Sequence, residues 1–506
     1  QAGVDVRHFL SSPAAREVIL PMLPQVLEQV CKLIDEVDNT DIVATIETIV
    51  ERFSDHVVPF AGTLTSKLVV AFLRASSAGE DEEESTLAAV QCVQAIQAIV
   101  QSAAEKQSAA LNRAAVVREL EPHLLPLFTN MFEEDRMDFF EDLLELLSLL
   151  VYYSAVNGQV PLSEHLWSMF PRLLAAFDQW AFDFSSNLVS PIDNFISNDT
   201  EQFLVRSHQG VPYPQLVFSM IVKLWSELDV DDDAEEGTKI AEVLVLNCTG
   251  RIDTIVESLV ERIVVRLNSA VGTKLKVLLL SNIAACLYYN AGLTLEVLDK
   301  RLNVCQQLFG LWLSMIDSFV RIHDKKLTLL ALSSVLRQPL EQLPESIKNG
   351  IPQLVHYCIA LVEKLRSERA QRGASAEPIF RPASGLKFAG SSERDFNDEE
   401  DADVNTIDDG YLERIAKEAG VDLGQLAAAV NVEDGDGDDD EDFLNMDDEG
   451  DFESPIDDVD EAHFFANSVR SLPDSAAQSL LALMQPSDST TLRQLLESAP
   501  QQEHQN

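Results

Sequence analysis

The feature that most constrains this 506-residue chain is a helical apolar period that recurs through roughly its first 368 residues. From Met137 to Leu150, apolar residues return every three or four positions with carboxylates on the opposite side, which is typical of one face of an α-helix. A break over 156–161 follows, and Ser163 then stands where a new helix needs its N-cap, before a second apolar run that reaches Phe177. The segment therefore predicts two antiparallel helices joined by a short turn.

The same two-helix pattern repeats along the chain. Further pairs are expected at 42–53 with 56–73, 85–103 with 111–132, 213–228 with 238–248, 252–267 with 274–289, and 302–322 with 325–336. The spacing is close to the ~40 to 47 residues of helical-hairpin repeats, and the length exceeds the ~250 to 300 residues at which a single core stops growing. We therefore predict an all-α fold, a HEAT-repeat superhelical solenoid over residues 1–368 with about eight helical pairs, each covering its neighbour's apolar face.

The second half of the chain changes character abruptly. Between Glu393 and Glu461 there are 29 Asp and Glu and three basic residues, so this stretch supplies −26 of the total formal charge of −47. Such a composition cannot bury enough apolar surface to order itself, which predicts a largely disordered acidic tract over 393–461, with one short helical element near 411–430. Residues 369–392 read as a flexible linker.

The C-terminal tail, 462–506, contains short amphipathic helices at 462–469, 475–483 and 491–496. They are too short to be stable alone. Three alternatives therefore stay open for them: docking on the solenoid, docking on a partner, or disorder.

The charge outside the acidic tract is still −21, which argues against nucleic acid or an anionic membrane as the main ligand and favours a basic protein partner. The most apolar segment, Leu275 to Tyr289, is interrupted by polar residues and shorter than the ~18 to 20 residues of a membrane span, so no membrane insertion is expected. The six cysteines lie far apart without a C-x-x-C pair, which indicates reduced, buried thiols in an intracellular protein.

Motifs for catalysis are missing. The chain has no G-x-S-x-G, H-E-x-x-H, G-x-x-x-x-G-K-[ST] or G-x-G-x-x-G sequence. The run from Asp434 resembles the opening of a calcium loop, but Asp439 stands where that loop needs Gly and Asn445 where it needs its closing Glu. His323 adjoins Asp324, yet neighbouring helical residues do not face each other, so a capping or packing role is expected. We predict that the chain is not an enzyme and that it has no cofactor and no metal site.

Two acidic groups are the candidate binding residues for a basic partner. One lies in a predicted connection between helices and the other in the acidic tract. They are Asp231, Asp232, Asp233, Glu235 and Glu236, and Asp438, Asp439, Asp440 and Glu441. The simpler interpretation, a solvated loop that keeps a large protein soluble, stays open beside electrostatic capture.

Several short motifs occur in order between about 41 and 420. They are Pro59-Phe-Ala, Leu166-Trp, Asp183-Phe, Pro191-Ile-Asp-Asn-Phe-Ile-Ser-Asn-Asp-Thr, Phe203-Leu, Cys248-Thr-Gly-Arg-Ile-Asp, Leu287-Tyr-Tyr-Asn, His323-Asp-Lys-Lys and Tyr411-Leu-Glu. This ordered set, followed by an acidic C-terminal tract, resembles the importin seven/eight branch of the β-karyopherins.

The resemblance implies a nuclear transport receptor that shuttles between cytoplasm and nucleus through the nuclear envelope and pore. Such a receptor carries basic cargo, for example ribosomal proteins and histones, contacts Phe-Gly nucleoporins and releases cargo on binding RanGTP. The match covers the C-terminal half of such a receptor, and the Ran GTPase is expected to bind mainly through N-terminal repeats absent here. Two alternatives stay open: an acidic chaperone for basic proteins, and a passive HEAT-repeat scaffold. Specific binding to Phe-Gly repeats would separate a transport receptor from both of these alternatives.

Overall fold

The computed structural model describes residues 57–77, 83–129, 131–226, 231–375, 454–473 and 486–498, with Met484 and a few positions between 20 and 53. The chain divides into two compact units, Gln1–Gly385 with Glu449–Asn506, and Leu386–Asp448. The second unit lies outside the described residues, and so do the predicted helical element near 411–430 and the candidate residues Asp438, Asp439, Asp440 and Glu441.

The described residues form an almost entirely helical fold. The N-terminal elements are η1 (Leu20–Met22), η2 (Val58–Phe60), α5 (Ala61–Ala75), α6 (Glu83–Glu105), α7 (Ala110–Leu124), η3 (Glu134–Phe139), α8 (Phe140–Ser154), α9 (Glu164–Gln179), η4 (Ala181–Phe184), α10 (Ser185–Asn198) and α11 (Thr200–Val205). A hairpin of β1 (Ser207–His208) and β2 (Val211–Pro212) then leads into the remaining helices. These are α12 (Tyr213–Leu224), α13 (Asp232–Asn247), α14 (Asp253–Ser269), α15 (Thr273–Glu296), η5 (Val297–Arg301), α16 (Cys305–Ser314), η6 (Ile316–Ser318), α17 (Ile322–Leu336), η7 (Leu340–Gln342), α18 (Glu345–Ser375), α22 (Glu461–Arg470) and α24 (Pro486–Ser498).

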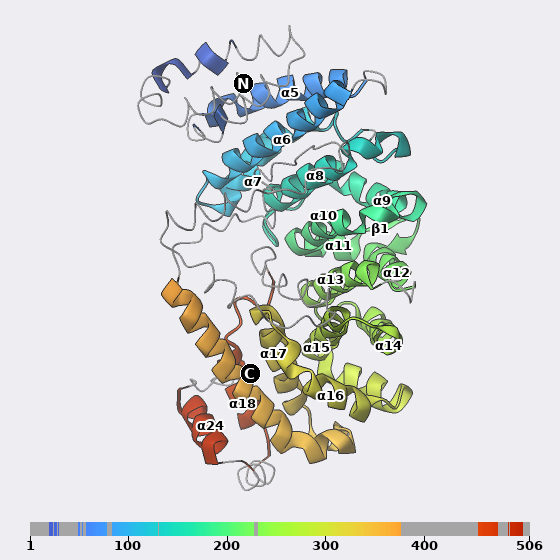
Figure 1. The fold of residues 1–506 in the computed structure, drawn as a ribbon, viewed down its shortest axis with the longest axis vertical. Coiled ribbons are helices and arrows are strands. Elements are labelled where there is room, and N and C mark those ends of the chain that lie inside the picture. Colours follow the sequence, from blue (N-terminus) through green and yellow to red (C-terminus); the bar gives the residue numbers. More distant parts are fainter. Residues whose placement is uncertain are drawn as a thin grey trace, which may run out of the picture. The chain divides into compact units, whose positions relative to one another are not determined.

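Successive helices pack in two rows, whose order can be followed in Figure 1. In the first row, α8, α10, α13, α15, α17 and α22 each contact the next. In the second row, α12 contacts both α9 and α14, and the rows join where α12 packs on α13 and α14 on α15. This repeated pairing confirms the predicted all-α repeat architecture.

The first-row helix α17 is buried on nearly every side, because α15, α22 and α18 all pack against it. In α17, every residue from Asp324 to Leu336 is buried. A helix that is apolar almost all round is expected in such an enclosed position. Second-row helices instead bury one face: in α9, Trp167, Phe170 and Leu173 are buried while Glu164 and Ser168 are exposed.

The predicted start of α9 is confirmed. Its N-cap is Ser163, whose Oγ accepts a hydrogen bond from the Leu166 N–H at 3.1 Å. The preceding break closes as a tight turn, with Val156 paired to Val160 and Gly158 at a φ of 73°, a conformation that glycine adopts without steric cost.

Three helices in the described part are long and apolar enough to cross a membrane by length and composition alone: Val58–Ala75, Ser85–Glu105 and Thr273–Arg301. The last of these helices is longer than the predicted apolar segment from Leu275 to Tyr289, because it continues on both sides of that segment. In this structure, 78% of the most apolar 18-residue stretch of Thr273–Arg301 is buried inside the protein.

The five described cysteines are all buried, as predicted. Burial raises the pKa of the Cys248, Cys286 and Cys305 thiols to about 12. These thiols are therefore protonated near neutral pH, and a protonated buried thiol is a poor nucleophile.

Two expected boundaries differ from the structure. The helix α18 continues to Ser375, so the predicted linker from 369 begins as helix. Residues 454–461, predicted as part of the disordered tract, form a turn and the start of α22. Both differences have the same cause: Arg369 on α18 bonds the Glu461 carboxylate at 2.5 Å, so the two segments hold each other in place. The predicted helices at 462–469 and 491–496 correspond to α22 and α24, which dock on the solenoid, whereas 475–483 lies outside the described residues.

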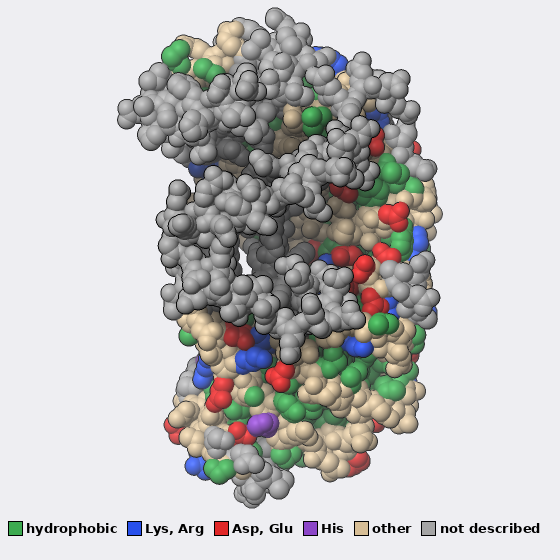
Figure 2. Space-filling model, viewed as in Figure 1, with side chains coloured by type: hydrophobic (Ala, Val, Ile, Leu, Met, Phe, Trp, Pro, Cys, Tyr) green, Lys and Arg blue, Asp and Glu red, His purple; other side chains and the backbone are tan. Residues whose placement is uncertain are grey.

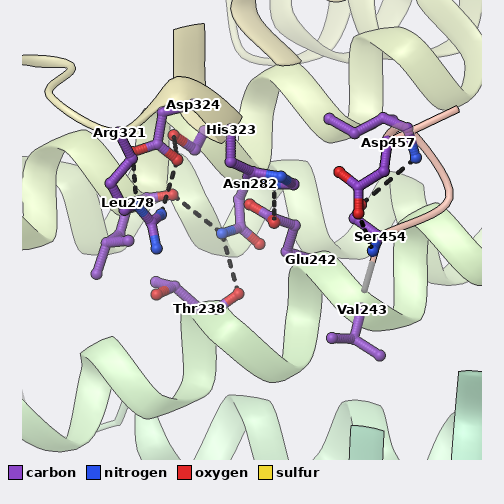
Figure 3. Close-up of polar contacts among 12 residues, drawn as sticks. Thr238, Glu242, Val243, Leu278, Asn282, Arg321, His323, Asp324, Ser454 and Asp457 are labelled. Atoms are coloured by element: carbon purple, nitrogen blue, oxygen red, sulfur yellow. Dashed lines mark hydrogen bonds and ion pairs between the residues drawn. The ribbon is translucent and has the colours of Figure 1, made fainter. Parts of the chain in front are cut away.

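Four consecutive residues tie α17 to four other elements, as Figure 3 shows in part. His323 Nε2 lies 2.7 Å from Glu242 Oε1 on α13, and Asp324 accepts a hydrogen bond from Ser281 Oγ on α15 at 3.3 Å. Lys325 Nζ lies 2.7 Å from the Glu368 carboxylate on α18. Lys326 Nζ donates to the Asp457 carbonyl, ahead of α22, at 2.8 Å. The expected packing role of His323 is thereby confirmed, with a partner on a different helix.

Other motifs singled out in the sequence contact one another in the same way. The Asp199 Oδ2 atom accepts hydrogen bonds from the Trp167 Nε1–H at 3.0 Å and the Leu162 N–H at 2.8 Å. The Tyr289 hydroxyl donates to Asp253 Oδ1 at 2.6 Å. These motifs therefore hold the helical pairs in register.

Replacing Asp199 by Ala should destabilise α9 and the turn before it by at least about 2 kcal/mol, because two buried N–H groups lose their acceptor at about 1 to 3 kcal/mol each. Hydrogen exchange of residues 156–179 measures this. The exposed Asp183→Ala variant serves as control and should change exchange by less than about 0.5 kcal/mol. Equal exchange in the two variants would contradict the assigned role of Asp199.

The His323–Glu242 pair should make stability depend on pH. Although burial acts in the opposite direction on each group, the contact raises the pKa of His323 above 6.5 and lowers the pKa of Glu242 below 4.5. The histidine's contribution is therefore complete below its unfolded pKa and is lost as pH rises through its raised folded pKa. We expect the thermal stability of the wild type to exceed that of His323→Gln most at pH 5.5 to 6.5, with a smaller difference at pH 9. A difference that grows toward pH 9 would exclude this assignment.

Candidate binding surfaces

The acidic start of α13 is more structural than its composition suggests. Asp231 accepts a hydrogen bond from Arg266 Nη2 at 2.7 Å, and its other oxygen accepts the backbone N–H groups of Val271 at 3.1 Å and Gly272 at 2.8 Å. Burial opposes ionisation, yet these donors hold the pKa of Asp231 below its usual value. Because Arg266 is 1% exposed, Asp231 compensates a buried cation.

The other four residues of the group divide between the protein interior and its surface. Glu235 is buried with its carboxylate 2.8 Å from Lys274 Nζ, and burial raises its pKa despite that lysine. Glu236 pairs with Lys239 at 2.9 Å. Asp232 is exposed, and Asp233 is half-buried with Ser185 Oγ at 3.5 Å. The structure therefore leaves Asp232 as the most accessible of the five predicted acidic residues.

A cavity of about 290 Å³ opens between second-row helices α9 and α12, and sequence reasoning did not find it. Its lining is mixed, with three aromatic residues, Phe177, Trp180 and Phe182, and four polar ones, Asp178, Gln179, Lys223 and Ser226. The Phe182 and Trp180 rings are partly exposed, whereas Phe177 is 1% exposed and forms the buried floor. A cavity that combines aromatic surface with polar groups can take a small ligand or a side chain.

Lys223 fixes the geometry of this cavity. Its Nζ lies 4.7 Å from the centre of the Phe177 ring and 5.6 Å from that of Phe182. It also donates to the Asp178 carbonyl at 3.2 Å and lies 3.3 Å from the Asp178 carboxylate. The Trp180 Nε1–H donates to the Phe132 carbonyl at 3.2 Å, which holds the indole at the rim.

The docked C-terminal segment covers a cationic part of α17 and α18. Glu461 lies 2.5 Å from Arg369 and 3.7 Å from Lys326, and both Glu461 and Lys326 are 7% exposed. Burial lowers the pKa of Lys326, although Glu461 opposes that shift. Beside this pair, the Phe464 ring lies 5.8 Å from Tyr288 and 5.2 Å from the Arg337 guanidinium.

Among the described side chains on the face drawn in Figure 2, the acidic ones do not form one continuous field. They lie in several small groups with basic side chains beside some of them. Among the residues that the structure describes, no three His, Cys, Asp or Glu side chains come close enough together to hold a metal ion.

The sequence matches the family described as "Importin-11-like, TPR repeats" over residues 94–404. It is 32% identical to the Importin beta-like SAD2 homolog of Arabidopsis thaliana, over 74% of this chain and 35% of that protein. It is 30% identical to the Probable importin-7 homolog of Dictyostelium discoideum, over 93% of this chain and 46% of that protein. In fold, it resembles the solved structure of Lph2, a bidirectional nuclear transport receptor of S. cerevisiae, with a TM-score of 0.52 at 14% identity, over 99% of this chain and 48% of that one.

The chain thus spans less than half the length of these relatives. The matched region begins within α6, ends beyond α18, and so includes both helix rows of the solenoid. The chain therefore belongs to the importin β superfamily, in the branch of importin-7 and importin-8.

Proposed function

We propose that this chain is the part of a nuclear import receptor that binds basic protein cargo and Phe-Gly nucleoporins. The observation that carries the proposal is the family match over 94–404, which covers the helices that form the second-row cavity and the acidic start of α13. The chain acts by binding and not by catalysis, in keeping with relatives that are named as importins.

The second-row cavity is our candidate for Phe-Gly repeats. The phenylalanine of a repeat would enter between Phe182 and Trp180, onto the floor made by Phe177. The glycine that follows would let the peptide backbone approach closely. Each such contact is weak, and weak contacts on many repeats give avidity while allowing rapid exchange.

Basic cargo, such as ribosomal proteins and histones, is supported by the charge of −47. The candidate cargo residues are Asp232 and Asp233 at the start of α13, together with Asp438, Asp439, Asp440 and Glu441 in the acidic tract. Asp231, Glu235 and Glu236 already bond cations of this chain and contribute less. In the intact receptor, RanGTP bound mainly to N-terminal repeats would regulate release, and the receptor would shuttle between cytoplasm and nucleus.

The acidic tract favours a second candidate function. A segment with 29 carboxylates among 69 residues could shield basic proteins without any transport, as an acidic chaperone does. Binding to Phe-Gly repeats separates the two, because a polyanionic shield has no need of an aromatic pocket.

Phe182→Ala should weaken binding of a Phe-Gly repeat peptide about two- to tenfold, since one aromatic contact contributes about 0.5 to 1.5 kcal/mol beyond its buried area. Binding is measured by NMR titration or biolayer interferometry with a nucleoporin segment. Val265→Ala is the matched control, because it removes an apolar side chain that is 56% exposed on α14 of the same row. Equal affinity for wild type and Phe182→Ala would rule out the cavity as the binding site, and no affinity in either would reject nucleoporin binding by this chain.

Binding of a histone or ribosomal protein should depend steeply on salt, because exposed charges are screened over ~8 to 10 Å at physiological ionic strength. Neutralising Asp438, Asp439, Asp440 and Glu441 together should lower the association rate more than neutralising Asp232 and Asp233. Stopped-flow binding at several salt concentrations measures both effects. Tighter binding after neutralisation of the tract would mean that it competes with cargo, and indifference to salt would reject the electrostatic account.

A further inference from the structure

The last described helix of the first row comes from a segment that is distant along the chain. Residues 454–473, here called the C-terminal segment, contain α22, which packs on α17 and α18. The helix α18 ends at Ser375, whereas this segment begins at Ser454. One neighbour of α17 is therefore supplied by a separate stretch of chain.

The polar contacts of the C-terminal segment with the solenoid share one arrangement of charge. Lys326 Nζ donates to the Asp457 carbonyl at 2.8 Å and lies 3.7 Å from the Glu461 carboxylate. Arg369 bonds the same carboxylate at 2.5 Å. In each of these contacts the solenoid supplies the cation, and the segment supplies the carboxylate or the carbonyl.

Aromatic and apolar groups complete the contact. Phe465 and Val469 of α22 are buried. The Phe464 ring lies 5.8 Å from the Tyr288 ring and 5.2 Å from the Arg337 guanidinium. The C-terminal segment is thus received by a basic and aromatic surface, which we call the α17 surface and which is formed by Tyr288, Lys326, Arg337 and Arg369.

The C-terminal segment is held less firmly than its burial suggests. The helix α22 has 10 residues, and isolated helices shorter than about 12 to 15 residues are marginal in water. Its folding therefore depends on the α17 surface, and the cost of ordering it weakens the contact. Lys326 and Glu461, each 7% exposed, also lose their water on docking, which offsets part of their attraction.

A surface of this chemistry suits an acidic helix that carries aromatic residues. On α22, Glu461, Phe464, Phe465 and Val469 stand at positions i, i+3, i+4 and i+8, which lie on one side of a helix. Partner helices commonly bind through anchors at such spacings. We propose that the α17 surface is a binding site for an acidic, aromatic amphipathic helix of a partner protein, and that the C-terminal segment occupies it as an internal competitor.

The charge of the α17 surface separates it from the candidate cargo residues. Those residues are acidic and would bind a basic protein, whereas the α17 surface presents cations. The net charge of −47 repels an acidic helix at a distance, but salt screens that repulsion over ~8 to 10 Å. Lys326 and Arg369 act in direct contact, where screening is weak. The inference therefore does not depend on the proposed transport function.

The internal helix and a partner helix cannot occupy the α17 surface together. The apparent affinity for a partner helix is the intrinsic affinity multiplied by the fraction of molecules whose surface is open. A substitution that weakens the C-terminal segment and leaves the α17 surface unchanged should therefore raise the apparent affinity by the same factor as it raises that fraction.

The first test uses the full chain, with a fluorescent synthetic peptide of sequence 454–473 as the partner helix. Phe464→Ala in the chain removes the ring contacts with Tyr288 and Arg337 but leaves those two residues in place. Hydrogen exchange of 461–470 should become about two- to tenfold faster, and fluorescence anisotropy should show tighter peptide binding by the same factor. Val265→Ala, which changes an exposed residue of α14, should alter neither measurement.

The second test exchanges charges across the contact. Because Arg369→Glu reverses the charge that faces Glu461, a peptide with Glu461→Arg should bind this variant chain several-fold tighter than the wild-type chain. Arg262→Glu is the matched control, since it makes the same change of net charge at an exposed position on α14.

Three results would overturn the inference. The first is no gain in peptide affinity in Phe464→Ala. The second is a Glu461→Arg peptide that does not distinguish Arg369→Glu from Arg262→Glu. The third is a dimer of the wild-type chain at micromolar concentration, detected by light scattering and lost on Glu461→Arg, because it would place the segment of a second copy on the α17 surface.

Discussion

The bonds made by His323, Asp324, Lys325 and Lys326 are the constraint on which the end of the described solenoid depends. In four successive positions, α17 reaches α13, α15, α18 and the segment before α22. A buried charge that loses its partner costs more than the pair contributes. The cost of losing a partner therefore fixes the four elements relative to α17 as much as the attraction between the partners does. These bonds select one packing arrangement for helices that apolar surfaces alone would allow to slide past one another.

Helix positions could be predicted because their signal is local. The spacing of Leu143, Leu146 and Leu150 indicates a helix face within three turns, and Ser163 lies next to the N–H groups it caps. The docking of the C-terminal segment has no such local signal. The partners of Arg369 and Lys326 are 92 and 131 residues away, and a sequence pattern does not say which distant oxygen atom will accept from a given cation.

The candidate surfaces show the same limit. The acidic run at 231–236 is evident from composition. However, Arg266, which donates a hydrogen bond to Asp231, lies 35 residues further along the chain. The cavity between α9 and α12 was not predicted because Phe177 also satisfies the helical period of a core face. What distinguishes it is Lys223, which reaches the carbonyl of Asp178 from 45 residues away. A basic residue near the end of the next helical pair is the sequence signal that could have indicated this cavity.

Internal pairing also changes how the charge of −47 can act on a partner. Asp231, Glu235 and Glu461 already face cations of this chain at 2.5 to 2.8 Å. A basic ligand would have to break those contacts and desolvate the released lysine or arginine, which costs more than the new contact returns. Close contact with a basic partner is therefore left to acidic residues outside these pairs, such as the exposed Asp232. A repeat protein can in this way be strongly acidic overall and still bind its partner at a restricted place.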